Sequence, residues 1–322
     1  MTVNPFWFLM NNNRVINIER VVMCVAYVLL VFPKNGLTSL LSPGASFDFM
    51  SVTQDAGIRS EGGSYGEYRV LKIFSNPARL SAQNSDITLG FSSQNLFEGS
   101  MDAWAVGSSW KPAKSAFSGW SFAVIASGYS IEPFNEVDYF GDKTGDVVTP
   151  EGMHVGLTAT KCKGYSGLGV TLHLAQESFG NLEGHNKTIN GASMDIGAEI
   201  HLIDFTAGAA LRGVGLGTPV VLNMGAWGKS SEIFSATAVS AEINLPITGA
   251  LAPYGSTGIS YSFSRFVSIN GGLTCPGRPD MLDMDFGLGV RNRNVRIDYG
   301  FTMAIWGMGS SHRLSLGWDL NI

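Results

Sequence analysis

Apolar and polar residues alternate without a break along the last eleven residues of the chain, HRLSLGWDLNI. Side chains in a β-strand point to opposite faces with a period of two. One face of this strand would therefore carry only apolar residues: Leu314, Leu316, Trp318, Leu320 and Ile322. The other face would carry Arg313, Ser315, Gly317, Asp319 and Asn321. The pattern predicts a strand that separates an apolar environment from a polar one.

The same alternation recurs from Asp86 to the end of the chain, in segments such as ITLGF, MHVGLTA, LGVTLHL and VRIDYGF. Turn-forming residues separate these segments, and no sustained helical period appears among them. We count about fourteen strands of roughly ten residues, the length of a tilted crossing of a bilayer. The pattern predicts an all-β fold, a transmembrane antiparallel β-barrel of about 14 strands. Two longer connections are expected, Glu132 to Pro150 and Phe179 to Gly191.

Charged residues fall on the face opposite the apolar one. A charged side chain that faces the bilayer centre costs about 2–4 kcal/mol for Arg or Lys, so these residues are expected to face the lumen. The predicted polar network comprises Asp195, Glu199, His201, Asp283, Asp285, Arg291, Arg296, Asp298, Arg313 and Asp319. Within it, Asp283 and Asp285 are expected to pair with Arg291 and Arg296, with cation binding as the alternative. A soluble barrel would bury the apolar face instead, and alternation alone does not separate the two arrangements.

Composition favours the membrane arrangement. Only 15% of the 322 residues are charged, against about 25% in typical soluble domains, and the chain has 40 Gly and 19 Phe. The net charge is −5 with no basic block, so nucleic acid is not an expected partner. Cys162 and Cys275 have no framework spacing. We expect two unpaired thiols, with a disulfide as the alternative.

The beginning of the chain resembles an export signal. The apolar run from Val21 to Phe32 follows Arg14 and Arg20, and it is too short to span a bilayer as a helix. We interpret residues 1–46 as a cleaved signal peptide with a long first region, which raises Met10 as an alternative start. An uncleaved anchor is the rival interpretation. Residues 47–85 lack alternation and are predicted to form a plug, and residues 86–322 the barrel.

Three motifs resemble those of the PorV/PorQ-like outer-membrane proteins, which belong to the FadL-type barrel superfamily. The plug motif Asn76-Pro77-Ala78-Arg79-Leu80 resembles the family's Asn-Pro-Ala-Gly-Leu. The segment AALRGVGLG, from Ala209 to Gly217, is similar to the end of a family strand. The C-terminal RIDYGF and HRLSL are similar to the family's final strands. The resemblance covers residues 56–322.

The resemblance implies a fourteen-stranded barrel with an N-terminal segment folded into its lumen. FadL-like members carry hydrophobic molecules across the outer membrane of Gram-negative-type bacteria, and PorV-like members serve type IX secretion. The first hypothesis is therefore a porin-like channel or transporter for small hydrophobic or amphipathic solutes. The alternative is a PorV-like component that binds or shuttles exported protein cargo. Expected partners are outer-membrane lipid, the barrel-assembly machinery, which would read the apolar C-terminal face, and secreted cargo or secretion-system subunits.

Catalytic chemistry is the weakest interpretation. His173 and His201 are expected to face the lumen with Glu199 nearby, which could make a base and its orienting carboxylate. A polar network is the favoured explanation of these residues. Ser166 in GYSGLG does not match a nucleophile elbow, and the His and Cys spacing offers no zinc site. We expect no enzyme activity, no cofactor and no metal.

Overall fold

The computed structural model describes Glu61 and residues 69–96, 99–112, 117–137, 143–182, 185–216, 220–229, 237–248, 253–275, 282–304 and 310–321. The predicted signal peptide, most of the predicted plug upstream of Arg69, and Ile322 lie outside the described residues. The predicted domain boundaries therefore stay predictions.

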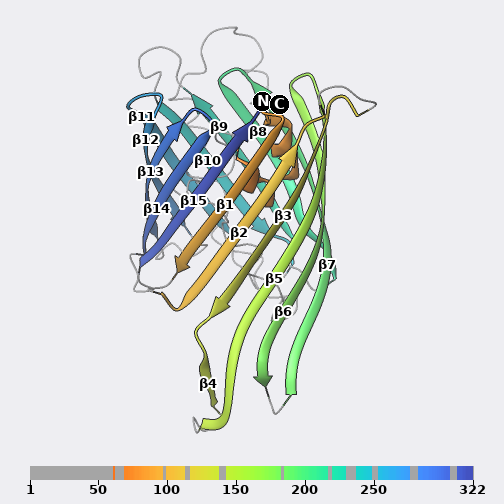
Figure 1. Cartoon of the computed structure of the whole chain (residues 1–322), viewed down its shortest axis with the longest axis vertical. Helices are drawn as coiled ribbons and strands as arrows, with labels where there is room; N and C mark the ends of the chain where they lie inside the picture. Colours follow the sequence, from red (N-terminus) through yellow and green to blue (C-terminus); the bar gives the residue numbers. More distant parts are fainter. Residues whose placement is uncertain are drawn as a thin grey trace, which may run out of the picture.

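Fourteen antiparallel strands close into a barrel (Figure 1). The strands are β1 (Ile87–Leu96), β2 (Met101–Trp110), β3 (Trp120–Ile131), β5 (Lys143–Lys163), β6 (Ser166–Leu182), β7 (His185–Leu202), β8 (Phe205–Leu216), β9 (Val221–Lys229), β10 (Thr237–Pro246), β11 (Tyr254–Ser262), β12 (Val267–Cys275), β13 (Asp283–Asn292), β14 (Val295–Ala304) and β15 (Ser310–Leu320). The sheet closes because β1 pairs with β15 and β3 pairs with β5. A short strand, β4 (Phe134–Val137), pairs only with β5 among the described strands. The predicted barrel of about fourteen strands is confirmed.

The apolar face of the wall points outward. In β15, Leu316 is 46% exposed, whereas its neighbour Ser315 is 2% exposed. Leu316 lies opposite Phe91 of β1 and Ile297 of β14, so the outward rows of neighbouring strands join into one apolar surface. A soluble barrel would place these side chains inside. The apolar residues of the alternation therefore form the outer surface of the barrel and not its core.

Hairpins at the two ends of the barrel differ. The end that carries the described chain termini has tight turns, such as Gly164-Tyr165 between β5 and β6. At the opposite end β5, β6 and β7 extend well past the other strands (Figure 1). The prediction of long loops from Glu132 to Pro150 and from Phe179 to Gly191 was wrong, because strands continue through much of both segments. Backbone hydrogen bonds between paired strands form these extensions, and that pairing does not require alternating apolar side chains.

Two short 3₁₀ helices, η3 (Val70–Phe74) and η4 (Pro77–Ala82), lie inside the ring of strands (Figure 1). Asn76 begins η4: its side chain accepts a hydrogen bond from the Ala78 amide at 2.9 Å, and Pro77 takes the first helical position. No helix among the described residues is long and apolar enough to cross a membrane.

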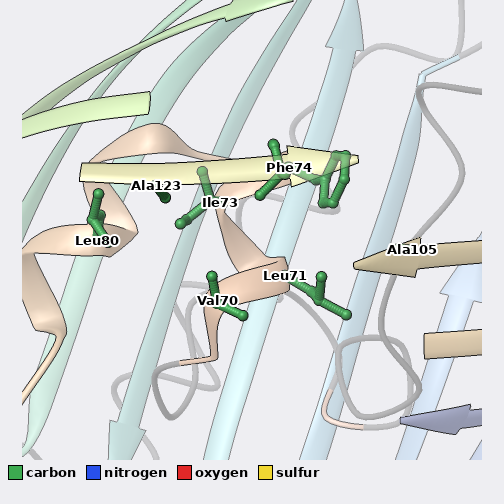
Figure 2. Close-up of a cluster of buried hydrophobic side chains, with 8 residues drawn as sticks. Val70, Leu71, Ile73, Phe74, Leu80, Ala105 and Ala123 are labelled. Atoms are coloured by element: carbon green, nitrogen blue, oxygen red, sulfur yellow. The ribbon is translucent and has the colours of Figure 1, made fainter. Parts of the chain in front are cut away.

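Apolar side chains of both helices pack against the inward face of the wall (Figure 2). The cluster comprises Val70, Leu71, Ile73, Phe74, Leu80, Ala105, Ala123 and Ile125. Its wall residues come from β2 and β3, so this part of the barrel interior has a small dry core in place of water. We call residues 69–85 the lumen segment.

Candidate functional site

The lumen segment sits on rows of glycine in the wall. A Cβ on Gly90 would lie 2.5 Å from the Val70 side chain, and one on Gly107 would lie 3.1 Å from it. Gly90 pairs with Gly107 and with Gly317, so glycines adjoin on three adjacent strands, and η3 packs over the first two. The wall is thinned at this position to admit the segment.

A second pair of wall glycines, which with the first we call the glycine seats, lies under η4. A Cβ on Gly169 of β6 would lie 2.5 Å from the Pro77 carbonyl carbon, and one on Gly197 of β7 only 1.9 Å from Asn76 Oδ1. These approaches are too close for any side chain, and Gly169 would meet backbone that cannot rotate away. Gly169 pairs with Gly197 across β6 and β7. Glycine at both positions is therefore a requirement of docking.

The predicted plug motif makes direct contact with the wall. Asn76 Nδ2 donates to the carbonyl oxygens of Ala198 at 3.3 Å and Ala209 at 3.4 Å. Thr160 Oγ1 donates to the Pro77 carbonyl at 2.8 Å. Asn76, Pro77, Ala78 and Leu80 are all buried. The motif thus attaches the lumen segment to β5, β7 and β8 by hydrogen bonds.

A buried ion pair joins η4 to β7. Arg79 Nη1 lies 2.6 Å from Glu199 Oε1, and His201 Nε2 lies 2.6 Å from the same oxygen. Ser81 Oγ lies 2.9 Å from His201 Nε2. Serine and carboxylate thus approach one ring nitrogen, whereas a catalytic triad uses opposite nitrogens. The arrangement fits a positional lock better than a nucleophile and base.

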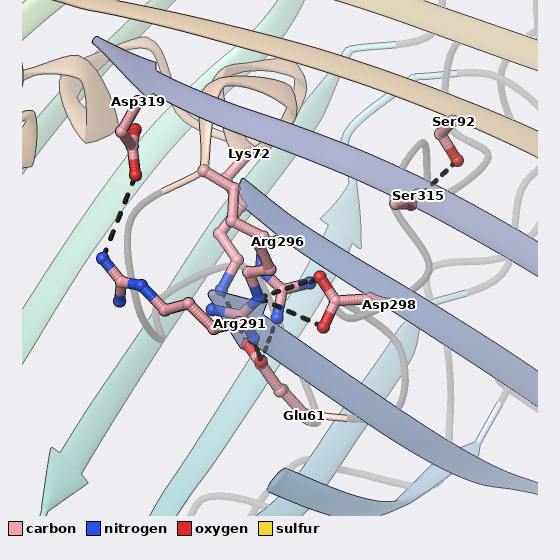
Figure 3. A network of polar contacts seen from close by, with 9 residues as sticks. Glu61, Lys72, Ser92, Arg291, Arg296, Asp298, Ser315 and Asp319 are labelled. Atoms are coloured by element: carbon pink, nitrogen blue, oxygen red, sulfur yellow. Dashed lines mark hydrogen bonds and ion pairs between the residues drawn. The ribbon is translucent and has the colours of Figure 1, made fainter. Parts of the chain in front are cut away.

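Glu61 is the centre of a charge cluster next to η3 (Figure 3). Arg69 bonds to it, Lys72 Nζ lies 2.9 Å from Oε2, and Arg296 Nη2 lies 3.2 Å from Oε1. Burial raises the pKa of Glu61, but Arg69, Lys72 and Arg296 outweigh burial and lower the pKa to about 2. Burial lowers the pKa of Lys72 to about 8 against the attraction of Glu61. Sequence reasoning missed Glu61, Arg69 and Lys72, because they lie where no period indicates a direction.

The residues predicted to form the lumenal network all lie on inward positions of their strands, but they divide into separate groups. Arg296 Nε bonds to both oxygens of Asp298, at 3.1 and 2.8 Å. Asp285 accepts from Thr274 at 3.0 Å and from Thr302 at 2.5 Å.

The expected pairing of Asp283 and Asp285 with Arg291 and Arg296 was wrong in its geometry. Asp285 and Arg291 are six residues apart on one strand, which separates them by about 20 Å. The register places Arg296 opposite Arg291 and Asp285 opposite Thr302, so the arginines and the aspartates occupy different levels of the barrel. Arg291 instead lies 4.0 Å from Asp319 (Figure 3). No cluster of three or more metal-ligating side chains occurs among the described residues, and Cys162 and Cys275 are not joined in a disulfide.

Two imidazoles and a carboxylate form a row across β5, β6 and β7 on the inner face of the wall, beside η3. His154 Nε2 lies 2.6 Å from His173 Nδ1, and His173 Nε2 lies 3.0 Å from Asp195 Oδ2. Asp195 also accepts a hydrogen bond at 2.7 Å from the amide of Gly213, where β8 bulges. The ring of Phe74 packs against His154, with 5.5 Å between centroids. Alternation correctly indicates the inward direction of His173 and Asp195, but the cross-strand register that joins them is not in the sequence.

Two adjoining cavities open at the end of the barrel that carries the chain termini. The larger, about 970 Å³, lies between the tips of the hairpins at β9, β11–β12 and β13–β14. The smaller, about 500 Å³, lies beside η4 and is lined by Arg79, His201 and Asp319 among others. Arg291, Arg293 and Arg296 line both cavities. We call this paired space the mouth.

No family model and no curated protein matches the sequence. Solved structures do match. The toluene transporter TbuX of Ralstonia pickettii has a TM-score of 0.62 at 10% identity, covering 85% of this chain and 100% of that one. The toluene transporter TodX of P. putida has a TM-score of 0.57 at 11% identity, covering 84% and 100%. A TodX mutant described as a monoaromatic hydrocarbon channel has a TM-score of 0.59 at 12% identity, covering 83% and 99%.

At these identities the likeness establishes fold and not activity. It agrees with the FadL-type part of the sequence resemblance, and none of these three structures supports the PorV/PorQ part. The closed ring of strands, the outward apolar surface and the long coverage of both chains all support a shared barrel fold. The chain has the barrel fold that is seen in the toluene transporters TbuX and TodX.

Proposed function

We propose that this chain is an outer-membrane channel or transporter for small hydrophobic or amphipathic solutes. The observation that carries the proposal is a closed barrel, apolar outside and polar inside, whose lumen holds a segment docked by specific contacts. A closed barrel satisfies every backbone group of the wall and can therefore cross lipid. The docked segment is the part that a solute would have to pass.

The location and partners follow from the same features. A fourteen-stranded barrel with an apolar outer belt belongs in the outer membrane of a Gram-negative-type bacterium, with lipid as its direct neighbour. We propose that the apolar C-terminal row, whose described members are Leu314, Leu316, Trp318 and Leu320, is read by the barrel-assembly machinery. In that setting the predicted signal peptide would direct export.

The class of solute is argued from the lumen and the comparisons together. TbuX and TodX are toluene transporters by name, which supports small hydrophobic solutes. The inward face of this chain adds carboxylates, arginines and hydroxyls, such as Asp285, Arg313 and Thr302, which supports amphipathic ones. We propose that residues 69–85 regulate passage, because they lie inside the barrel and a small set of buried contacts, among them the Arg79–Glu199 ion pair, attaches them to the wall.

Conductance of the purified full chain in planar bilayers tests the proposal. We expect discrete openings for the wild type and a higher open fraction for Arg79→Gln, which loosens the lumen segment. Lys163→Gln removes a charge from an outward, exposed position and should behave as the wild type. Silence of every variant would overturn the channel. Silence together with co-purified secreted protein would favour the cargo-binding alternative.

A further inference from the structure

The larger cavity of the mouth is lined by cations. Five of the described residues around it are basic and none is Asp or Glu: Lys229, Arg265, Arg291, Arg293 and Arg296. Rings of Arg and Lys select anions and phosphate in channels. The hydroxyls of Ser262, Ser264 and Ser268 add hydrogen-bonding groups to the same lining.

Three carboxylates lie near these cations, and two of them, Asp298 and Glu61, are each shared by more than one cation. Asp298 bonds to Arg296 and also lies 3.5 Å from Arg69. Glu61 is shared among Arg69, Lys72 and Arg296. Asp319 lies 4.0 Å from Arg291 and accepts hydrogen bonds from Ser85 and Thr88. The mouth and the described residues behind it therefore hold more positive than negative charge.

Arg293 adds an independent observation. It occupies the first position of the two-residue turn between β13 and β14 with a φ of +50°, and it is the only residue other than glycine with positive φ among the described residues. Glycine is the residue that such a turn position favours, because a Cβ is strained there. Keeping an arginine at a strained position points to a requirement for its side chain. That side chain lines both cavities.

The smaller cavity supplies an apolar surface next to the arginines. Tyr165, Leu202, Ile203 and Trp227 line it together with Arg291, Arg293 and Arg296. The planar guanidinium group binds phosphate oxygens in pairs and is weakly hydrated, which suits it to a phosphate beside apolar side chains. The two cavities together fit a ligand with a phosphate at one end and an apolar part at the other.

We propose that the mouth is a binding site for a phosphate-bearing ligand. The phosphate lies among Arg265, Arg291 and Arg293, and any apolar part lies against Trp227 and Leu202. This goes beyond the proposed channel, because a site at the mouth binds its ligand whether or not solute passes through the lumen. The same chemistry is offered by a phospholipid headgroup and by a soluble phosphate compound.

Calorimetric titration of the full chain in a neutral detergent separates these sources. The probes are inorganic phosphate, decyl phosphate, decanoate and decyl maltoside. Binding of inorganic phosphate and decyl phosphate with equal affinity supports a soluble ligand, and tighter binding of decyl phosphate supports a lipid. Decyl maltoside or decanoate binding as tightly as decyl phosphate would overturn the proposal, because neither carries the phosphate.

Variants of Arg293 remove the ambiguity of misfolding. Arg293→Gly relieves the strained backbone and removes the charge, so we expect phosphate binding about five-fold weaker with no loss of thermal stability. Arg293→Lys keeps the charge and should retain more of the affinity. Lys163→Gln, a charge removed outside the cavity, should leave binding unchanged. Wild-type affinity of Arg293→Gly, or equal weakening by Lys163→Gln, contradicts the proposal.

The outcomes for site and channel are distinct. A silent bilayer recording with intact phosphate binding overturns the channel and leaves the site. An open current without phosphate binding overturns the site and leaves the channel.

Discussion

Arg79 of the lumen segment and Glu199 of β7 form a buried ion pair, with 2.6 Å between Nη1 and Oε1. Both side chains are almost inaccessible to water. Removing one member of such a pair leaves a buried charge without its partner, which costs about 3–5 kcal/mol. We therefore expect Arg79→Gln to destabilise docking by a large part of that amount, since His201 still contacts Glu199.

The measurement is protease cleavage within residues 69–85 of the folded barrel, compared with global unfolding in urea. Replacing both members, as Arg79→Met with Glu199→Leu, should restore much of the protection, because apolar pairs of similar volume often substitute for buried ion pairs. If Arg79→Gln protects the segment as well as the wild type does, the ion pair does not hold it.

The glycine seats give a second prediction. Gly169→Ala would bring a methyl group within 2.5 Å of the Pro77 carbonyl carbon and 2.6 Å of the Ala78 amide nitrogen. We expect η4 to be displaced while the barrel stays folded, seen as faster cleavage of the lumen segment. Gly271→Ala is the matched control, because a Cβ there meets no atom within 4 Å. Equal behaviour of the two variants would argue against a close-packed seat.

Acid should weaken the cluster around Glu61. The pKa of this carboxyl is about 2 in the folded chain and 4.5 when unperturbed. A lowered folded-state pKa means that the stabilisation is complete above pH 4.5 and is lost as the pH falls toward 2. The difference corresponds to on the order of 3 kcal/mol.

The comparison to make is the unfolding free energy of the wild type and Glu61→Gln between pH 2 and pH 7. We expect the wild type to be more stable at neutral pH and the gap to shrink steadily below pH 4.5. A gap that is independent of pH would show that the charge of Glu61 contributes nothing to folding.

The outward face predicts a contrast between two lysine substitutions. Leu316→Lys places a charge in the middle of β15 on the apolar surface, where we expect a loss of about 2–4 kcal/mol in lipid vesicles. Ser260→Lys places the same charge on an inward position of β11 and should cost far less. Equal costs in reversible unfolding would mean that acyl chains do not surround the barrel.

Much of the wall could be predicted from sequence because its chemistry is periodic. Leu314, Leu316 and Trp318 are apolar, whereas Arg313 and Ser315 are polar. If lipid is outside, only the strand orientation that turns the three apolar residues outward is favourable. Neighbouring strands obey the same rule, so their inward and outward faces follow without knowledge of their partners.

The docked segment could not be predicted in detail for the opposite reason. Glu61, Arg69 and Lys72 lie in a stretch with no period, and Arg296, the wall residue that pairs with Glu61, is 235 residues away from it. The Asn76-Pro77 motif drew attention to the right segment, but the close approach of Gly169 and Gly197 appears only when strand register is known. The structure also places Asp285 and Arg291 at different levels of the barrel, although their opposite charges alone suggest an ion pair.

The glycine rows have a mechanical consequence. Where Gly90, Gly107 and Gly317 adjoin, and again where Gly169 meets Gly197, the wall presents bare backbone to the interior. If residues 69–85 undocked, two patches of wall without side chains would face the interior. At these positions the room that the lumen segment would vacate is already set by the glycines of the strands, so no wall side chain would have to move to leave it open.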